Sequence, residues 1–280
     1  MLKRFFKRVF PGLVVFRRRV LHLFDLYNLK VDEQIRARQL AHPNPLTRYG
    51  RKGYSQTDED GITFEIIQRL QIQGGCFAEF GVGDGTENNT LSLLALGWRG
   101  FWVGGETLAF DWTKSSRLHY ERSWVTLENI VTSYRAGLSA LKADALDLVS
   151  LDLDGNDLYF IEALLQAGCL PKLFIAEYNA KFPPPMRFTI DYDARHSWDG
   201  SDYQGVSLYS LNELFEKHGY SLIACNAATG ANAFFVRNEY RDRFPEVPTA
   251  LDQLYAAPAF FLFDRYAHPT SIRTIETIIR

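Results

Sequence analysis

Short apolar runs alternate with amphipathic segments along most of the chain. Compact apolar runs predict buried strands, and apolar positions that recur every three or four residues predict helices. We expect strands at 76–80, 100–103, 124–127, 146–151, 173–176, 220–225 and 232–236. We expect helices at 57–73, 86–96, 112–120, 158–167 and 207–218. The alternation predicts a mostly parallel, doubly wound α/β sandwich of seven strands, whose last two strands form a terminal hairpin.

The N-terminal segment has a different character. Residues 1–24 contain seven lysines and arginines and no acid, and their apolar residues share one side of a helix. This composition is typical of a helix lying on an anionic membrane surface. A helix packed on the domain or on a second subunit is the alternative, so we also consider a homo-oligomer. A second, more polar helix is expected at 25–41.

Length and composition favour one principal domain. The 280 residues are 46% hydrophobic, enough for one large core. We expect a helical extension at 1–45, the main domain at 46–240 and a C-terminal extension at 241–280, with an apolar patch at 259–263.

Cysteine content and hydropathy indicate the cellular compartment in which the protein is expected. The three cysteines lack metal-type spacing, which suits buried thiols in a reducing compartment. The N-terminal apolar run falls far short of the roughly 20 residues that span a bilayer. We therefore expect a cytoplasmic protein, peripheral at the inner membrane face, with no nucleic-acid partner.

A glycine-rich turn follows the first predicted strand. Gly81, Gly83 and Gly85 leave room for a ligand to approach the backbone closely. Glu79 precedes them, where a carboxylate would repel a pyrophosphate but attract a cationic amino group, so S-adenosylmethionine is favoured over a dinucleotide. Glu106 follows the next strand, at the position where an acid accepts hydrogen bonds from ribose hydroxyls. An ordinary turn and a solvated acid are the alternatives.

Three segments together resemble a known family. Residues 55–60 read Ser-Gln-Thr-Asp-Glu-Asp, residues 77–100 contain the glycine turn, and residues 147–155 end in Asp-Leu-Asp-Gly. They resemble the FkbM-like branch of the class I S-adenosylmethionine-dependent methyltransferases, over about residues 54–180. The resemblance implies methylation of hydroxyl groups, often on sugars, glycolipids or polyketides. The chain departs from the branch at Asp154-Gly155 and at Gly104-Gly105-Glu106. We also assign Gln56, Asp84 and Asn129 to the cofactor site.

Acids and an amide follow the fourth and fifth predicted strands. Asp152, Asp154, Glu177 and Asn179 should meet at the carboxyl edge of the sheet. Such oxygen ligands suit Mg²⁺, which would hold an acceptor hydroxyl and lower its pKa, with Asp152 and Glu177 next to the reaction. Alternatively, acids here cap the helix that follows.

The polar and aromatic segment 179–205 should cover this edge as a lid. His196 is the candidate general base for removing the acceptor proton, although a lone loop histidine is more often simply solvated. Four aromatic residues offer surfaces that stack on sugar rings or pack beneath a lid: Tyr178, Tyr192, Trp198 and Tyr203.

The sequence thus predicts an O-methyltransferase that uses S-adenosylmethionine, assisted by Mg²⁺ or by His196. Its acceptor would be a carbohydrate, glycan or glycolipid-type hydroxyl. Two alternatives remain open. One is a non-catalytic interaction module with a methyltransferase fold. The other is a glycosyltransferase in which Asp152 and Asp154 hold a metal and a nucleotide sugar.

Overall fold

The computed structural model describes residues 11–260, 272, 275–276 and 279. Its centre is a sheet of seven strands in the order β3-β2-β1-β4-β5-β7-β6. The strands are β1 (Cys76–Phe80), β2 (Arg99–Gly104), β3 (Leu118–Arg122), β4 (Leu148–Leu151), β5 (Leu173–Glu177), β6 (Tyr220–Cys225) and β7 (Asn232–Arg237). The first five strands are parallel, and β7 runs antiparallel to β5 and β6. The predicted fold, a doubly wound and mostly parallel sheet of seven strands, is confirmed.

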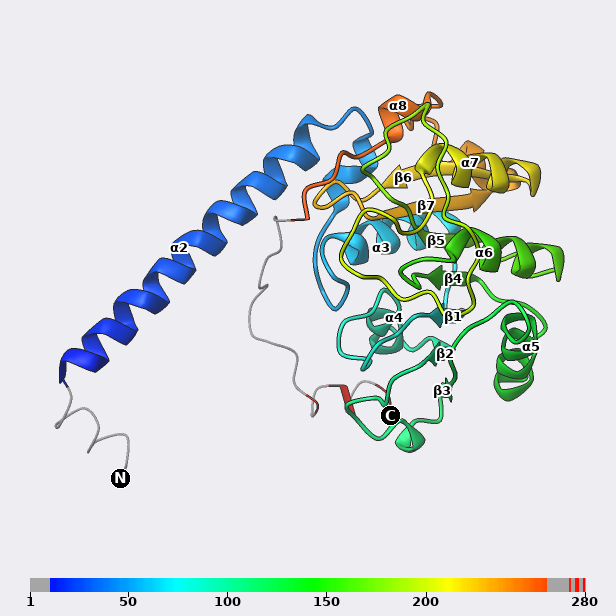
Figure 1. The fold of residues 1–280 in the computed structure, drawn as a ribbon, viewed down its shortest axis with the longest axis horizontal. Helices are drawn as coiled ribbons and strands as arrows, with labels where there is room; N and C mark the ends of the chain where they lie inside the picture. Colours follow the sequence, from blue (N-terminus) through cyan, green and yellow to red (C-terminus); the bar gives the residue numbers. More distant parts are fainter. Residues whose placement is uncertain (1–10, 261–271, 273–274, 277–278, 280) are drawn as a thin grey trace.

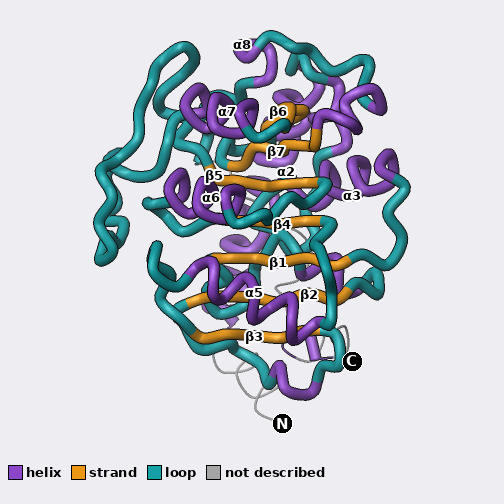
Figure 2. Tube along the Cα trace, turned by 90° about the vertical axis from the view of Figure 1, so that its right-hand side faces the viewer, coloured by secondary structure: helices purple, strands orange, loops and turns teal. Residues whose placement is uncertain are grey.

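Helices cover both faces of this sheet. The helices of the domain are α3 (Glu59–Leu70), α4 (Leu91–Ala95), α5 (Ile130–Leu141), α6 (Asp157–Gln166), α7 (Leu208–Lys217) and α8 (Leu251–Leu254). Figure 1 shows α5, α6 and α7 on one side of the strands and α3 and α4 on the other. Figure 2, turned by 90°, shows the strands stacked in sheet order. Because both faces are covered, the inner strands β1 and β4 are buried along their whole length.

The core is built largely of aromatic and branched side chains. Phe80 and Phe101, on neighbouring strands β1 and β2, meet edge to face with ring centroids 6.0 Å apart. On the α7 side, Phe215 stacks on Phe235 of β7 at 3.9 Å. Burial of such side chains is the main stabilising contribution, at about 1.5–3 kcal/mol for each large apolar residue.

The N-terminal helix α2 (Pro11–Ala41) is one continuous element of 31 residues. The prediction of a separate helix beginning at residue 25 was therefore wrong. Its C-terminal part meets the domain, where Val31 is buried against Ala259, and the remainder projects away from the domain (Figure 1). No helix among the described residues is long and apolar enough to cross a membrane.

The C-terminal residues return to the domain. Beyond the short helix η3 (Asn238–Arg243), Ala259 packs against α2, while Ile275 and Ile279 are fully buried in the main core. Ser115, after the short helix η2 (Trp112–Lys114), donates a hydrogen bond to the carbonyl of Ile279. Most of the predicted apolar patch at 259–263 lies outside the described residues.

Three element predictions between β2 and β4 were wrong. The expected helix at 112–120 is η2 followed by β3, because Leu118 and Tyr120 face inward while His119 and Glu121 are less buried, which is a strand pattern. The expected strand at 124–127 is a loop, in which the N–H of Thr126 is bonded to the Asn129 side chain. Helix α5 was not predicted at all.

Helix α4 is also shorter than the predicted 86–96. The backbone N–H groups of Asn89 and Thr90 donate to the Glu79 carboxylate, which holds the preceding residues in a loop. The helix therefore begins only at Leu91.

Gly137 offers a test of the packing between α5 and the sheet. An alanine Cβ at this position would lie 2.4 Å from the Phe101 ring. In an open helix, replacing glycine by alanine stabilises by about 1 kcal/mol. Here we expect Gly137→Ala to destabilise by about 1–3 kcal/mol because α5 must move off the sheet. Urea unfolding measures the effect. Ser139→Ala, at an exposed position of the same helix, is the control and should be neutral or mildly stabilising; a stabilising Gly137→Ala would contradict the packing.

Candidate functional site

The glycine turn lies directly against the end of β4. Gly81 has φ +96°, and a Cβ built on it would be 1.6 Å from the carbonyl oxygen of Asp152. Gly83, at φ +51°, has nothing within 4 Å of such a Cβ and borders open space. Gly85 instead approaches the apolar side chains of Leu108, Phe110 and Trp102. Gly81 and Gly83 thus form the surface of the turn, and Gly85 fixes it to the core.

Two adjoining cavities, of about 390 Å³ and 460 Å³, meet at this turn. Both are lined by Gly81, Gly83, Asp152 and Asp154. The smaller cavity adds the predicted cofactor residues Gln56, Glu79 and Asp84. The larger adds Glu106, Ser123, Trp124, Asn156, Phe160, His196 and Trp198. Residues from β1, β2, β4, the loop after β3 and the segment after β5 therefore converge on one place, at the carboxyl ends of the parallel strands.

Glu79 lines the smaller cavity, but its oxygens are already hydrogen-bonded. They accept from the N–H of Asn89 at 2.9 Å and from the N–H and hydroxyl of Thr90. Burial raises the pKa of Glu79 to about 7 despite these donors. Its first role is thus to shape the part of the cavity wall formed by Asn88 and Asn89. When ionised, the Glu79 carboxylate would also attract a cationic ligand bound in this cavity.

Glu106 and Asp84 are both exposed. Glu106 borders the larger cavity, with its backbone fixed by the Tyr120 hydroxyl, which donates to the Glu106 carbonyl. Asp84 borders the smaller cavity and accepts hydrogen bonds from the N–H and hydroxyl of Thr86. Asp84 is thus mainly a turn-forming residue, whereas the Glu106 carboxylate is available at the cavity wall.

Asn129 does not line either cavity. Its side chain accepts from the N–H of Thr126 and donates to Ser123 and to the carbonyl of Trp124. It therefore acts one step away from the cavity, by fixing the loop that places Ser123 and Trp124 in the wall. The structure corrects its predicted role from a contact residue to a supporting one.

Residues 55–60 form the support behind Gln56. Asp60 accepts the N–H groups of Gly53, Tyr54 and Ser55, each at 2.8 Å, and the Ser55 hydroxyl. These hydrogen bonds to the Asp60 carboxylate hold the loop that places Gln56 in the wall of the smaller cavity.

Three carboxylates gather beneath the shared wall. One oxygen each of Asp152, Asp157 and Glu177 lie within 4.8 Å of one another. Burial, followed by repulsion from Asp154 and Asp157, raises the pKa of Asp152 to about 8. Burial and the charge of Asp152 raise the pKa of Glu177 well above its usual value. Glu177 Oε2 has no hydrogen-bond partner among the described residues. The cluster therefore lacks a positive charge, which a divalent cation would provide.

The predicted metal ligands are only partly assembled. Asp152 and Glu177 belong to the cluster together with Asp157. Asn179 donates to the carbonyls of Asp202 and Gln204, which fixes the two ends of the lid segment. Asp154, at φ +54°, lines both cavities but is outside the cluster. Asp157 could have been found as the first acid of α6, where it also accepts the N–H groups of Leu153 and Gly155.

The lid segment is docked over the larger cavity. Trp124 Nε1 donates to the carbonyl of Ala194 at 2.8 Å, and Asn156 Nδ2 donates to the carbonyl of Asp193. His196 packs so closely on Gly155 that a Cβ there would lie 2.2 Å from its ring. His196 Nε2 is buried and without a hydrogen-bond partner in the described part of the chain.

The predicted stacking aromatics divide into two groups. Tyr178 is buried and donates to the carbonyl of Ala256, and Tyr192 packs against Phe160, so both are packing residues. Trp198 is 52% exposed and lines the larger cavity together with Trp124, which is 56% exposed. Trp124 was missed because its segment was expected to be a buried strand.

No protein-family model and no curated protein sequence matches the chain. Several solved structures are similar in chain path. The cofactor-bound protein Rv0187 from MTB is 13% identical, with 75% of this chain and 90% of that chain covered at a TM-score of 0.39. The O-methyltransferase from Bacillus cereus in complex with SAH is 12% identical, with 74% and 90% covered at 0.38. The O-methyltransferase TomG from Streptomyces achromogenes is 11% identical, with 66% and 82% covered at 0.38. These scores are too low to support an inference, and the fold assignment rests on the strand order.

The two glycines at the cavity wall should respond differently to a methyl group. Gly81→Ala would force the turn away from the Asp152 carbonyl, and we expect a loss of at least about 3 kcal/mol of stability. Gly83→Ala faces open space and should cost only about 1–2 kcal/mol, for its left-handed backbone. Thermal and urea unfolding of the pair measure the difference. Equal effects would show that the close contact between Gly81 and β4 does not exist in solution.

Proposed function

We propose that this protein is an S-adenosylmethionine-dependent O-methyltransferase. The proposal is carried by one observation: the glycine turn, Glu106 and the acids after β4 line one continuous pair of cavities at the carboxyl ends of the strands. In a doubly wound sheet this is where ligands bind. The FkbM-like branch is the proposed relationship, because residues 55–60 form the ordered support of Gln56 in the cavity wall.

Each part of the cofactor matches one part of the cavities. The smaller cavity, with Glu79 and Asp84 in its wall, would hold the cationic amino-acid part. Glu106 would accept hydrogen bonds from the ribose hydroxyls. The flat side chains of Phe160 and Trp124 border the remaining space and would contact the adenine ring.

The acceptor would enter beneath the lid. Methyl transfer to oxygen requires an acceptor hydroxyl held in line with the methyl group and relieved of its proton. His196 borders the larger cavity and its Nε2 has no described hydrogen-bond partner, which supports it as the group that would take that proton once the acceptor is bound. The exposed face of Trp198 suits the apolar face of a sugar ring, which supports a carbohydrate, glycan or glycolipid-type acceptor.

The carboxylate cluster fits a hard divalent cation such as Mg²⁺. Asp152, Asp157 and Glu177 would supply oxygen ligands, and burial raises the pKa of each of these acids, with repulsion from neighbouring carboxylates adding to the effect. When bound, such an ion lowers the pKa of an acceptor hydroxyl. We propose metal assistance with this ligand set, in place of the predicted set containing Asp154 and Asn179.

Cofactor binding is the direct test of the proposed class. Titration calorimetry should show binding of S-adenosylhomocysteine and no binding of nucleotide sugars. Glu106→Ala should weaken S-adenosylhomocysteine binding about 10–100-fold, because it removes a charged hydrogen-bond acceptor. Glu128→Ala is the matched control, since Glu128 is exposed on the neighbouring loop and lines neither cavity. Binding of nucleotide sugars alone would favour a glycosyltransferase. Cofactor binding without turnover of any glycan acceptor would favour an interaction module.

The carboxylate cluster predicts a pH dependence. The pKa of Asp152 is raised from 3.8 to about 8 in the fold, so the folded protein holds a proton that the unfolded chain releases. Without metal, stability should therefore fall as the pH rises from about 4 to about 8. Mg²⁺ should reverse this loss at the alkaline end of the range, where it replaces protons, and raise the melting temperature.

Asp152→Asn separates the cluster from other titrating groups. It should flatten the pH dependence and remove the Mg²⁺ effect, as measured by thermal unfolding. Asp144→Asn, at an exposed position before β4, should behave like the parent protein. A parent protein that Mg²⁺ does not stabilise at any pH in this range would rule out the metal and leave His196 as the proton acceptor.

A further inference from the structure

Most of helix α2 stands free of the domain. Between Val15 and Lys30, every residue except Val20 and Asn28 is exposed. At a rise of about 1.5 Å per residue, this part is an arm of roughly 24 Å. Figure 1 shows it projecting from the side of the domain that carries α3. A helix of this length is marginal in isolation and is normally stabilised by burial of one face.

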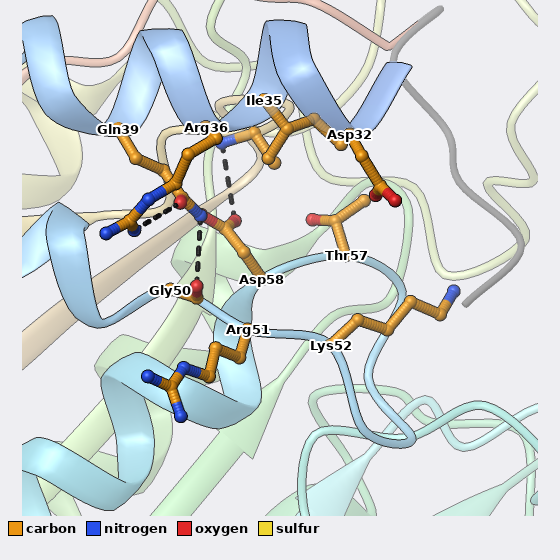
Figure 3. A pocket seen from close by; sticks show the side chains of 10 residues that line it. Asp32, Ile35, Arg36, Gln39, Gly50, Arg51, Lys52, Thr57 and Asp58 are labelled. Atoms are coloured by element: carbon orange, nitrogen blue, oxygen red, sulfur yellow. Dashed lines mark hydrogen bonds between the residues drawn. The ribbon is translucent and has the colours of Figure 1, made fainter. Parts of the chain in front are cut away.

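The base of the arm is fixed firmly to the domain. Gln39 Nε2 donates to Asp58 at 2.8 Å and to the carbonyl of Gly50 at 3.2 Å, beside the small cavity drawn in Figure 3. Arg38 donates to the carbonyls of Ala227 and Ala257. The direction of the arm is therefore set by the domain, and the free part presents a defined surface.

One side of the arm is apolar and uncovered by any described residue. Phe16, Leu23, Phe24 and Tyr27 have exposed fractions of 65%, 64%, 60% and 55%. At 100° per residue, these four side chains fall within about a third of the helix circumference, on a side that continues toward Val31. Val31 is only 3% exposed because it packs on Ala259. The same side of the helix is thus covered at its base and uncovered along the arm.

The charge of the arm indicates what covers it. Arg17, Arg18 and Arg19 follow Phe16 directly, and residues 1–24 contain seven basic residues and no acid. Two of these arginines, Arg17 and Arg19, lie at the borders of the apolar side by helical geometry. Arginine side chains in that position place their stems on apolar surface and their guanidinium groups in the phosphate region of a bilayer.

We propose that the α2 arm docks on an anionic phospholipid surface through the apolar side that contains Phe16, Leu23, Phe24 and Tyr27. The aromatic and leucine side chains enter the interface, and Arg17 and Arg19 pair with lipid phosphates, while Arg18 adds positive charge near the surface. A parallel second copy fits less well, because it would bring two sets of three arginines together. The inference does not depend on the proposed function, since the arm lines neither cavity at the carboxyl edge.

Vesicle co-sedimentation of the full-length protein tests this surface. Binding is expected to vesicles of phosphatidylcholine mixed with phosphatidylglycerol, and much less to phosphatidylcholine alone. It should weaken with added salt, since the screening length falls to about 3 Å at 1 M. Replacing Arg17, Arg18 and Arg19 by glutamine should weaken binding about 100-fold, which corresponds to about 3 kcal/mol for three basic residues near an anionic surface.

Two further variants complete the design. Arg135→Gln, Lys142→Gln and Lys217→Gln together remove the same charge from exposed positions of the domain and should leave vesicle binding unchanged. Phe16→Ser, Leu23→Ser and Phe24→Ser together keep the charge and should lower binding by removing apolar area. All replaced side chains are exposed, so circular dichroism and the melting temperature should match the parent protein.

The opposite results would overturn the proposal. If the triple variant of the arm and the triple variant of the domain lost vesicle binding equally, only the net charge of the protein would matter. Light scattering and vesicle binding together test a second copy as the partner. That partner would be identified if the parent protein had twice the monomer mass and did not bind anionic vesicles, and if the Phe16, Leu23 and Phe24 variant were monomeric.

Discussion

The contact between the turn after β1 and the end of β4 determines the rest of the site. The backbone of Gly81 lies so close to the carbonyl of Asp152 that no side chain fits between them. This contact brings the glycine turn and the first acid of the carboxylate cluster into one wall, shared by both cavities. A parallel sheet makes it possible, because neighbouring strands β1 and β4 end at the same edge.

Buried carboxylates are used in two distinct ways in this protein. Asp60 and Glu79 accept several backbone and hydroxyl donors each, and they shape the loops that carry Gln56 and Asn89. Asp152 and Glu177 face other carboxylates, and Glu177 Oε2 has no described donor. An acid whose donors are complete is structural, whereas a buried acid left without donors retains affinity for a proton or a cation. The number of hydrogen-bond donors thus distinguishes acids that support a loop from acids that could bind a proton or a cation, although the sequence does not distinguish them.

Access to the cavities and the orientation of the molecule are controlled by different segments. The lid, fixed through Trp124, Asn156 and Gly155, covers the larger cavity. Helix α2 is fixed at Gln39 and Arg38, on the side that carries α3, and does not line that cavity. A membrane-bound arm would therefore hold the domain near a lipid surface without contacting the lid or the larger cavity. The proposed methyltransferase activity and the proposed membrane binding are therefore compatible, and each can be tested without the other.

The sequence by itself determined six of the seven strands, the glycine turn and the gathering of acids at one edge of the sheet. Strand patterns such as 76–80 and 220–225 are local, and the acids at strand ends are brought together by any parallel sheet. Tertiary structure decided the rest. Whether Glu79, Asn129 and Asn179 contact a ligand or support a loop depends on which donors and carbonyls the folded chain places against them. The region between β2 and β4 was misread because β3 is stabilised by pairing with β2, and neighbouring residues in sequence do not encode that partner.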